Sequence, residues 1–361
     1  MVKVGIVGAT GIVGQQALMA LLGHKWFEVS ALVASPRSAG KPYQEALKGP
    51  NGDIAWWGSP VIPEEYGNMT VISSESFDPE SVDMVFSTME SGAAKELEPK
   101  YARTTPVVST ASAFRYEPDV PILIGGINMK EHAPLIEVQK KKRNWKGFVI
   151  PKPNCTTAGM VLALKPVMDC FGVEQATMTS LQAISGAGRT PGVGGMDILD
   201  NVVPYIAGEE PKAASEPQKI LGTYENESIT HADFPVHATC FRVPVIDGHT
   251  VSVVVKTKKK PDLDALYKYI DGFGKDFLAL NLPSSPERLI EYTLDPYRPQ
   301  PRLDRERGDG MTVTMGRMEV SDTFENTMRF ICLSHNTKYG AAKGLLQTAE
   351  YLAKEYLQWV K

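Results

Sequence analysis

The sequence contains few cysteines and no long hydrophobic run. Its cysteines stand at positions 155, 170, 240 and 332 of a 361-residue chain, without metal-ligand spacing and without the density of a disulfide-stabilised domain. No apolar stretch reaches the length of a membrane span, and no apolar signal segment precedes the first expected strand. We therefore expect a cytoplasmic protein with reduced thiols, no metal site and no membrane contact.

An excess of positive charge is also lacking. The chain has 38 Lys and Arg residues against 42 Asp and Glu residues, a formal net charge of −4. Two short basic runs, residues 140–143 and 256–260, are not interleaved with aromatic residues, so we expect them to be solvated ends of helices or strands. This composition argues against a nucleic-acid partner. The length predicts two domains, each with its own core.

The first residues have the pattern of a dinucleotide-binding turn. A β-branched run at residues 1–7 leads into residues 8–14, GATGIVG, and then into a helical stretch over residues 15–22. Glycines at this spacing allow a tight turn, close approach of the backbone to a pyrophosphate and close packing of helix on strand, and the helix N-terminus favours phosphate. The strand before the turn and the helix after it argue against the alternative, a glycine-rich turn without a ligand.

The loop after the second expected strand indicates which dinucleotide is bound. That strand spans residues 27–34, and the loop, residues 35–41, reads SPRSAGK. NAD-binding proteins usually carry an acidic residue here for the ribose 2′-hydroxyl, whereas this loop offers Arg37, Ser35 and Ser38 to a 2′-phosphate. We therefore predict NADP over NAD; the alternative is a polar surface loop.

Strands and helices alternate up to about residue 150. Strands over residues 83–88 and 106–109, and a helix opening at residue 91, predict a mostly parallel sheet whose ligands lie at the carboxyl ends of its strands. Residues 83–92, which include Thr88, are therefore expected to line the nicotinamide side of the coenzyme.

Beyond Cys155 the pattern changes to that of an α+β domain with a mixed or antiparallel sheet. We expect strands 239–245 and 250–256 to be antiparallel neighbours joined by residues 246–249. The Gly-, Pro- and Glu-rich residues 189–235 are expected to form a long excursion used for oligomer contacts or as a lid. The other expected elements are strands at 173–185, 311–320 and 327–333, an amphipathic helix at 262–273 and a final amphipathic helix at 340–360.

Residues 151–159, PKPNCTTAG, are the segment most informative about chemistry. They place Cys155 where a proline-rich extended stretch gives way to an apolar helix over residues 160–168, capped by Asn154 or one of the following threonines. Unpaired N–H groups and the positive end of the helix dipole favour the thiolate there, which makes the sulfur a nucleophile. The alternative is a small buried hydrophobic residue, and that is what we expect of the other three cysteines.

A domain that binds a hydride donor, combined with an activated thiol, predicts aldehyde or acyl chemistry through a thioester. Such chemistry needs an acid/base group. Of the six histidines, His249 follows a tight turn in the strand pair that also carries Arg242, and it is our candidate. The alternative for His249 is a structural role.

Four separated motifs together resemble the aspartate-β-semialdehyde dehydrogenases. They are residues 8–14, residues 153–157 (PNCTT), Gln182 with residues 185–188 (SGAG), and residues 242–244 (RVP) ahead of His249. The resemblance covers essentially the whole chain. The loop at residues 34–41 is more similar to the archaeal and fungal branch of this family than to the typical bacterial one.

The resemblance implies a role for each matching residue. Cys155 would be the nucleophile, His249 the general acid/base and Gln182 the residue that orients the substrate at the thiol. Arg242 would hold the substrate α-carboxylate. Either Glu209 or Glu210 would lie near the substrate amine, because residues 209–212 match the family's Glu and Lys pair only approximately. The other implied contacts are Arg115, Asn154 and Lys212 to phosphate, and Thr10, Gly11, Ile12, Val13, Ser35, Arg37, Ser38, Thr88, Ser185, Gly186 and Asn336 to NADP.

The family likeness implies NADPH-dependent reductive dephosphorylation of L-4-aspartyl phosphate to L-aspartate 4-semialdehyde, in the biosynthesis of threonine, methionine and related amino acids. We expect an α/β chain with a Rossmann-type NADP-binding domain at residues 1–154, completed by a C-terminal helix at 336–361. A catalytic and oligomerisation domain is expected at residues 155–335, in a homodimer or homotetramer. The alternatives are malonyl-CoA reductase, N-acetyl-glutamyl-phosphate reductase and a non-catalytic coenzyme-binding sensor.

Overall fold

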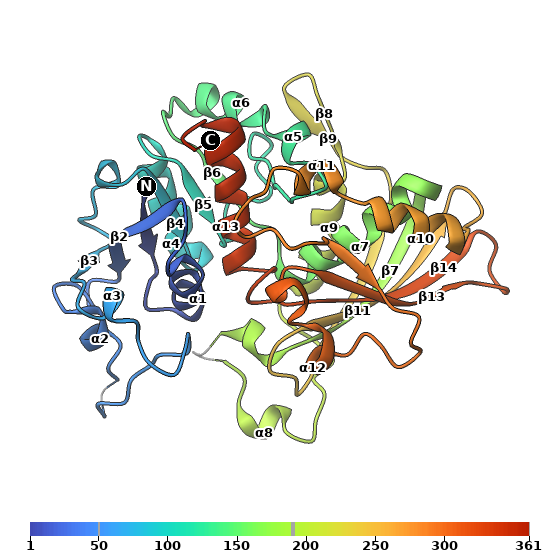
Figure 1. Ribbon diagram of the computed structural model, residues 1–361, viewed down its shortest axis with the longest axis horizontal. Coiled ribbons are helices and arrows are strands. Elements are labelled where there is room, and N and C mark those ends of the chain that lie inside the picture. The colour runs from blue at the N-terminus through green and yellow to red at the C-terminus, as the bar shows by residue number, and fades with distance from the viewer. Residues whose placement is uncertain (50, 189–191, 361) are drawn as a thin grey trace. The chain divides into compact units, whose positions relative to one another are not determined.

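The computed structural model describes residues 1–49, 51–188 and 192–360, which fall into two compact units (Figure 1). The first unit comprises residues 1–122, 133–152 and 341–361, and the second comprises residues 123–132 and 153–340. The C-terminal segment therefore belongs to the same unit as the N-terminal strand. Within the described residues, every helix is too short or too polar to span a bilayer.

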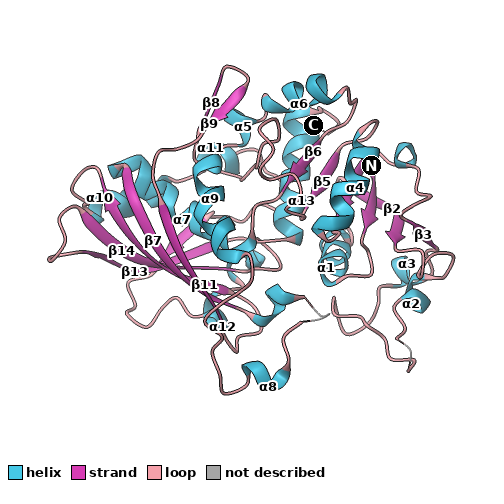
Figure 2. Ribbon diagram, turned by 180° about the vertical axis from the view of Figure 1, so that it is seen from behind, coloured by secondary structure: helices cyan, strands magenta, loops and turns pink. Residues whose placement is uncertain are grey.

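The first unit is built on one parallel sheet with strand order β3-β2-β1-β4-β5-β6 (Figure 2). This confirms the predicted sheet, and the change of direction between β1 and β4 is where doubly wound sheets bind ligands. Its elements are β1 (Val2–Val7), α1 (Ile12–Leu21), β2 (Phe27–Ala34), α2 (Tyr43–Ala46), α3 (Glu64–Gly67), β3 (Val71–Ser73), β4 (Met84–Ser87), α4 (Ser91–Ala102), β5 (Val107–Ser109), α6 (Leu135–Arg143), β6 (Val149–Pro151) and α13 (Ala342–Tyr351).

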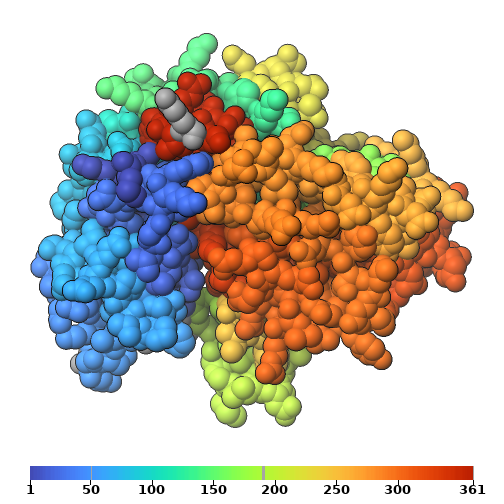
Figure 3. Space-filling model, viewed as in Figure 1, coloured from blue at the N-terminus to red at the C-terminus, as the bar shows by residue number. Residues whose placement is uncertain are grey.

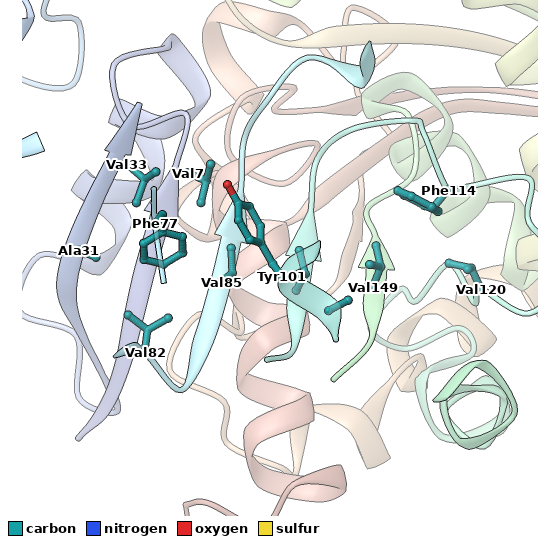
Figure 4. Packing of buried hydrophobic residues seen from close by; sticks show 12 residues of the cluster. Val7, Ala31, Val33, Phe77, Val82, Val85, Tyr101, Phe114, Val120 and Val149 are labelled. Carbon is teal, nitrogen blue, oxygen red and sulfur yellow. The ribbon is translucent and has the colours of Figure 1, made fainter. Parts of the chain in front are cut away.

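Buried side chains on this sheet hold the first unit together (Figure 4). Val7, Val33 and Val85 are fully buried, as expected of parallel strands covered on both faces. The ring of Phe77 packs edge-on against that of Tyr101, with the centroids 5.5 Å apart. The glycine-rich turn begins directly after Val7, which belongs to this buried cluster.

The final helix is shorter than predicted and is buried on nearly all sides. α13 ends at Tyr351, and residues Leu352–Tyr356 continue as a π-helical turn. Its buried Glu350 accepts a hydrogen bond from the His24 ring, with Nε2 and Oε1 2.9 Å apart. The helix has the predicted amphipathic pattern and is part of the core of the first unit.

The second unit is built on a mixed sheet with strand order β10-β7-β11-β14-β13-β12, which confirms the predicted α+β class. Its elements are α5 (Met129–His132), α7 (Cys155–Phe171), β7 (Val173–Gln182), α8 (Gly195–Ile198), α9 (Glu209–Ile220), β8 (Thr223–Glu225), β9 (Ser228–Thr230), β10 (Val236–Arg242), β11 (His249–Thr257), α10 (Leu263–Gly272), α11 (Lys275–Leu278), β12 (Ile290–Tyr292), α12 (Pro301–Asp304), β13 (Val313–Val320) and β14 (Thr327–Ser334).

The prediction that β10 and β11 are antiparallel neighbours is wrong, because β7 lies between them. β7 runs parallel to β10 and antiparallel to β11. The connection after β10 crosses the end of β7 and pairs with it, since Ile184 N donates to Val245 O and Ser185 N to Ile246 O. β7 consequently ends at Gln182, earlier than predicted, and a 3₁₀ turn over Ile184–Ala187 follows it.

The predicted excursion over residues 189–235 is wrong for residues 209–220, which form α9. Residues 189–191 lie outside the described residues. The segment around α8 exposes Met196 and Leu199, and in Figure 3 it projects in yellow-green from the second unit. α9, in contrast, packs on α7 and β10 and buries Glu216 and Ile220. This packing brings the first residues of α9 to the start of α7.

Candidate active site

The start of α7 is fixed by the side chain of Asn154. Its Oδ1 accepts the backbone N–H groups of Thr156 and Thr157 at 3.0 and 3.2 Å. Of the capping residues left open by the sequence, the cap is therefore Asn154, and Cys155 is the first residue of the helix. α7 packs closely on β14 at Gly159, because a Cβ at this position would overlap Ser334.

The sulfur of Cys155 lies beside the ring of His249. Sγ is 3.2 Å from Nε2, and His249 is completely buried as the first residue of β11. The other ring nitrogen, Nδ1, accepts the backbone N–H of Ala183 at 3.1 Å. A backbone N–H can only donate, so Nδ1 carries no proton, and a neutral ring holds its proton on Nε2, facing the sulfur.

Arg242 lies on the same side of the sheet as His249, and it binds the same residue, Ala183. Its Nη1 donates to the carbonyl oxygen of Ala183 at 2.7 Å. A Cβ at Gly186 would lie 3.0 Å from Nη1 of Arg242 and 3.2 Å from Cε1 of His249. The backbone at Gly186 thus covers both side chains, and a larger residue there would displace one of them.

Gln182, Glu209 and Lys212 form a polar cluster next to Asn154. Glu209 Oε2 accepts from Asn154 Nδ2 at 2.8 Å and from Gln182 Nε2 at 3.4 Å, and its Oε1 lies 2.9 Å from Lys212 Nζ. Burial opposes ionisation, but Lys212 and the Asn154 hydrogen bond keep the pKa of Glu209 below its ordinary value. Glu210 instead accepts the backbone N–H of Cys240, so Glu209 is the glutamate at this cluster.

Glu216 is a site residue that the sequence did not reveal. This buried carboxylate, two turns after Glu209 on α9, accepts the backbone N–H of Asn154 at 2.7 Å. Asn154 is therefore held by two carboxylates of one helix while it caps another. Only the spacing of Glu209 and Glu216 on one helical face could have indicated this, and many surface helices have that spacing.

Asn336 and Ser185 connect the turn before β11 with the turn after β7. Asn336 Oδ1 accepts the backbone N–H of Gly248 at 2.8 Å, and its Nδ2 lies 2.8 Å from Ser185 Oγ. Asn336 is buried, and its amide is used within the second unit. It therefore holds the residues that flank His249.

The glycine-rich turn of the first unit has the geometry of a phosphate cradle. Gly8 has a φ of +88°, and a Cβ at this position would approach Thr88 Oγ1 to 2.7 Å. A Cβ at Gly14 would overlap the carbonyl oxygen of Gly8. Gly11, the N-cap of α1, has no side chain to cap the helix, which leaves the N–H groups of Ile12 and Val13 facing the turn.

The other predicted ligands of the first unit lie at the ends of strands. Ser35 and Arg37 are exposed after β2, and Ser38 is half-buried. Arg115 is buried after β5, where its Nε donates to Lys152 O at 2.7 Å and its Nη2 to Thr110 O at 2.9 Å. Burial and the charge of Arg115 lower the pKa of Lys152 to about 7. The side chains of Arg115 and Lys152 thus lie close together in the segments that follow β5 and β6.

The remaining cysteines differ from Cys155 in their surroundings. Cys240 and Cys332 are buried in strands, and burial raises the pKa of Cys332 to about 12. Cys170 lies in the last turn of α7, and burial raises its pKa as well. Their environments favour the thiol. Cys240 and Cys332 are buried as predicted, whereas Cys170 is only half-buried.

Comparisons with known proteins agree with this arrangement. Residues 3–134 match the family model "Semialdehyde dehydrogenase, NAD binding domain", and residues 164–338 match "Semialdehyde dehydrogenase, dimerisation domain". The aspartate-semialdehyde dehydrogenase of Archaeoglobus fulgidus is 43% identical, with 98% of each chain covered. That of Methanothermobacter thermautotrophicus is 40% identical, covering 98% of this chain and 99% of the relative. The crystal structure of the Candida albicans enzyme with NADP has a TM-score of 0.86 at 36% identity, with 98% of each chain covered.

Proposed function

Because this chain belongs to the aspartate-semialdehyde dehydrogenase family, we propose that it interconverts L-4-aspartyl phosphate and L-aspartate 4-semialdehyde with NADP(H) as coenzyme. The observation that carries the proposal is the sulfur of Cys155, which lies in the first turn of α7 and 3.2 Å from His249 Nε2. A thiol in this position suits acyl transfer through a thioester. The reaction would serve the biosynthesis of threonine, methionine and related amino acids.

The glycine-rich turn of the first unit fits the pyrophosphate of the coenzyme. Thr10, Gly11, Ile12 and Val13 would bind it through backbone N–H groups at the start of α1. Ser35, Arg37 and Ser38 would bind the 2′-phosphate, because no carboxylate of the loop at residues 35–41 repels it. Thr88, Ser185, Gly186 and Asn336 complete the proposed coenzyme contacts. When bound, the coenzyme supplies or accepts the hydride.

The residues of the second unit can attack and hold an acyl group. Cys155 would form the thioester as phosphate leaves, and His249 is the group nearest to the sulfur. Gln182, which is buried and directed toward Glu209, would orient the substrate at the thiol. The positive end of the α7 dipole would favour negative charge on the substrate oxygen.

The charges of the site suit an amino-acid substrate with a phosphorylated side chain. Arg242 would bind the α-carboxylate through its planar guanidinium, and the ionised Glu209 would bind the α-ammonium group. Lys212, Asn154 and Arg115 are the proposed phosphate contacts. Malonyl-CoA has no ammonium group at the acyl chain for Glu209 to bind, which favours the aspartyl substrate over this alternative.

We propose that the protein acts as a cytoplasmic homodimer or homotetramer. The match to the dimerisation-domain model supports self-association of the second unit. One face of its sheet is also open, since Thr177, Leu181 and Val254 of neighbouring strands are exposed. This open face is where we expect a second copy of the chain to bind.

The test is a spectrophotometric assay of NADP reduction with L-aspartate 4-semialdehyde, with and without inorganic phosphate. We expect activity that requires phosphate and is greater with NADP than with NAD. Parallel reactions with malonyl-CoA and N-acetyl-glutamyl phosphate, each with NADPH, should give no turnover. The control is Cys155→Ala, which should lose the activity and still bind NADP. Phosphate-independent turnover, or an active Cys155→Ala protein, would refute the proposal.

A further inference from the structure

The backbone N–H of Asn154 is bonded by a side chain from another helix. Glu216 of α9 is 1% exposed, and its Oε2 accepts this N–H at 2.7 Å. In a capping box, a Glu or Gln three residues into the helix accepts the N–H of the residue that caps it. In α7 that position is Thr157, and the acceptor comes from α9 instead.

Resting on the proposed function, we propose that Glu216 is a positioning residue for the Cys155 nucleophile. It acts through the peptide group of Asn154, which fixes the direction in which α7 begins and therefore the place of the sulfur beside His249. What this role requires is an acceptor oxygen at the right reach, and not a negative charge.

The residue before the nucleophile is held on both sides. The N–H of Asn154 is bonded to Glu216, and its carbonyl oxygen accepts the N–H of Ala158 at 2.9 Å. Peptide groups are planar, so two such bonds leave only the two dihedral angles of Asn154 to vary. Its side chain, which caps α7, restrains these as well. Cys155 follows directly, so a rotation of the first of these peptide groups is carried on to its sulfur.

The surroundings of Cys155 give the sulfur little freedom to compensate. A Cβ at Gly340 would lie 2.7 Å from the Cβ of Cys155, so the backbone of Gly340 lies directly against this side chain. On its other side, Sγ is 3.2 Å from His249 Nε2. A shift of the helix start toward Gly340 is blocked, and a shift in another direction moves the sulfur relative to the imidazole.

The place of Glu216 on α9 fixes the reach of its oxygen. It lies between Ala213 and Ile220, which are buried on the same side of the helix, and α9 packs on α7. An apolar residue would suit this packing face better, because burial of a carboxyl group opposes folding. The bond to the N–H of Asn154 gives this unfavourable group a role in the active site.

Two substitutions separate the reach of Glu216 from its charge. Glu216→Gln keeps an acceptor oxygen at the same distance and removes the charge, whereas Glu216→Asp keeps the charge and shortens the side chain. We expect Glu216→Gln to retain kcat within about threefold and Glu216→Asp to lose about 10- to 100-fold, because small displacements of reacting groups slow a reaction strongly. KM for L-aspartate 4-semialdehyde should change less than kcat, because Arg242 and Glu209 keep their places.

A purely structural role would lower the stability of both variants and leave the kcat of the folded proteins unchanged. That outcome would overturn the inference, as would a lower kcat in Glu216→Gln than in Glu216→Asp. If Glu216→Asp does not fold, Glu216→Gln still decides, because a loss above about tenfold in the folded protein would assign the effect to the charge.

Alkylation of Cys155 by iodoacetamide at pH 7, without substrate or coenzyme, provides a readout that does not depend on activity. Mass spectrometry of the peptide that contains Cys155 follows the reaction. Glu216→Asp has the charge of the wild type, so a several-fold slower alkylation, as we expect, reports displacement of the sulfur. Glu216→Gln should react at least as fast as the wild type, because loss of a nearby negative charge favours thiolate.

A wild-type rate of alkylation in folded Glu216→Asp would overturn the inference. Failure of the phosphate-dependent assay in the wild type would instead refute the proposed function, and the alkylation rates would still test what places the sulfur of Cys155.

Discussion

Position 186 tolerates no side chain without cost to the active site. A Cβ there would lie 3.0 Å from Arg242 Nη1 and 3.3 Å from His249 Nε2, so one of them must move. We expect Gly186→Ala to lower kcat/KM about tenfold, because small displacements of reacting groups slow the reaction strongly. Steady-state kinetics with L-aspartate 4-semialdehyde and phosphate would measure this.

The matched control is Gly195→Ala in α8. A Cβ at Gly195 would meet no atom within 4 Å, and alanine is the better helix former. This variant should keep the kcat/KM of the wild type. If Gly186→Ala is equally active, the backbone at Gly186 does not confine His249 and Arg242.

Single residues differ in how far the sequence reveals them. Cys155 could be predicted because its motif and its place at a helix start have a chemical meaning. Glu216 could not, because its partner is a backbone N–H that packing of α9 on α7 brings into reach. Nor could Ala183, whose contribution to the site is a peptide group and not a side chain.

At the scale of elements, the start of α7 depends on Asn154. Asn154→Ala removes the acceptor of two backbone N–H groups and the donor to Glu209. We expect the free energy of unfolding to fall by about 1–2 kcal/mol, as for loss of an N-cap. Urea unfolding followed by circular dichroism would measure the change.

A comparison with Asn154→Asp separates the cap from the link to α9. Aspartate keeps the capping oxygen but repels Glu209 and donates nothing to it. We expect Asn154→Asp to be more stable than Asn154→Ala and still impaired in kcat/KM. Equal stability of the two variants would mean that the cap contributes little to α7.

A buried carboxyl group on α4 makes the stability of the first unit depend on pH. Burial raises the pKa of Glu98 from 4.5 to about 7, opposed by the hydrogen bond from Ser109. Between these pH values the unfolded chain has lost the proton that the folded one keeps, so rising pH favours unfolding. The free energy of unfolding falls by about 3 kcal/mol in total, and the fall is complete above pH 7.

Glu98→Gln should remove this dependence while keeping an acceptor for Ser109 Oγ, which lies 2.5 Å from Oε1. We expect the free energy of unfolding of the wild type to fall relative to that of Glu98→Gln from pH 4.5 to 7. Urea unfolding at each pH can be followed by tryptophan fluorescence. All five tryptophans, at positions 26, 56, 57, 145 and 359, lie in the first unit. Parallel curves for the two proteins would contradict the assignment.

The elements themselves could be predicted well where they depend on local pattern. The strand at residues 27–34 and the helix opening at Ser91 have the predicted limits. The order of β10, β7 and β11 could not be predicted, because it depends on a connection that hydrogen-bonds across the end of a third strand. Short spacing between strands suggests a hairpin, and nothing local contradicts it.

At the scale of the whole chain, its two ends are joined in the first unit by His24 and Glu350. The imidazole accepts the N–H groups of Trp26 and Phe27 at Nδ1 and contacts the buried Glu350 through Nε2. We expect His24→Ala to destabilise the first unit by about 3 kcal/mol, since it deprives a buried carboxyl group of a partner. Tryptophan fluorescence during urea unfolding would report it.

The control for that prediction is His24→Asn. Its side-chain oxygen can replace Nδ1 as the acceptor in the turn but cannot reach Glu350. If His24→Asn loses nearly as much stability as His24→Ala, the effect comes from the contact between His24 and Glu350 of α13. Wild-type stability in His24→Asn would show that the turn matters and the link does not.

The assignment of residues 341–361 to the first unit has a consequence for protein synthesis. A ribosome makes the chain from its N-terminus, and domains generally fold as they emerge. Here the unit that contains β1 must wait for residues 341–361, which are translated after the whole sequence of the second unit. The unit that is begun first is therefore completed after the other one, and a nascent chain halted before α13 would leave the first unit open to chaperones.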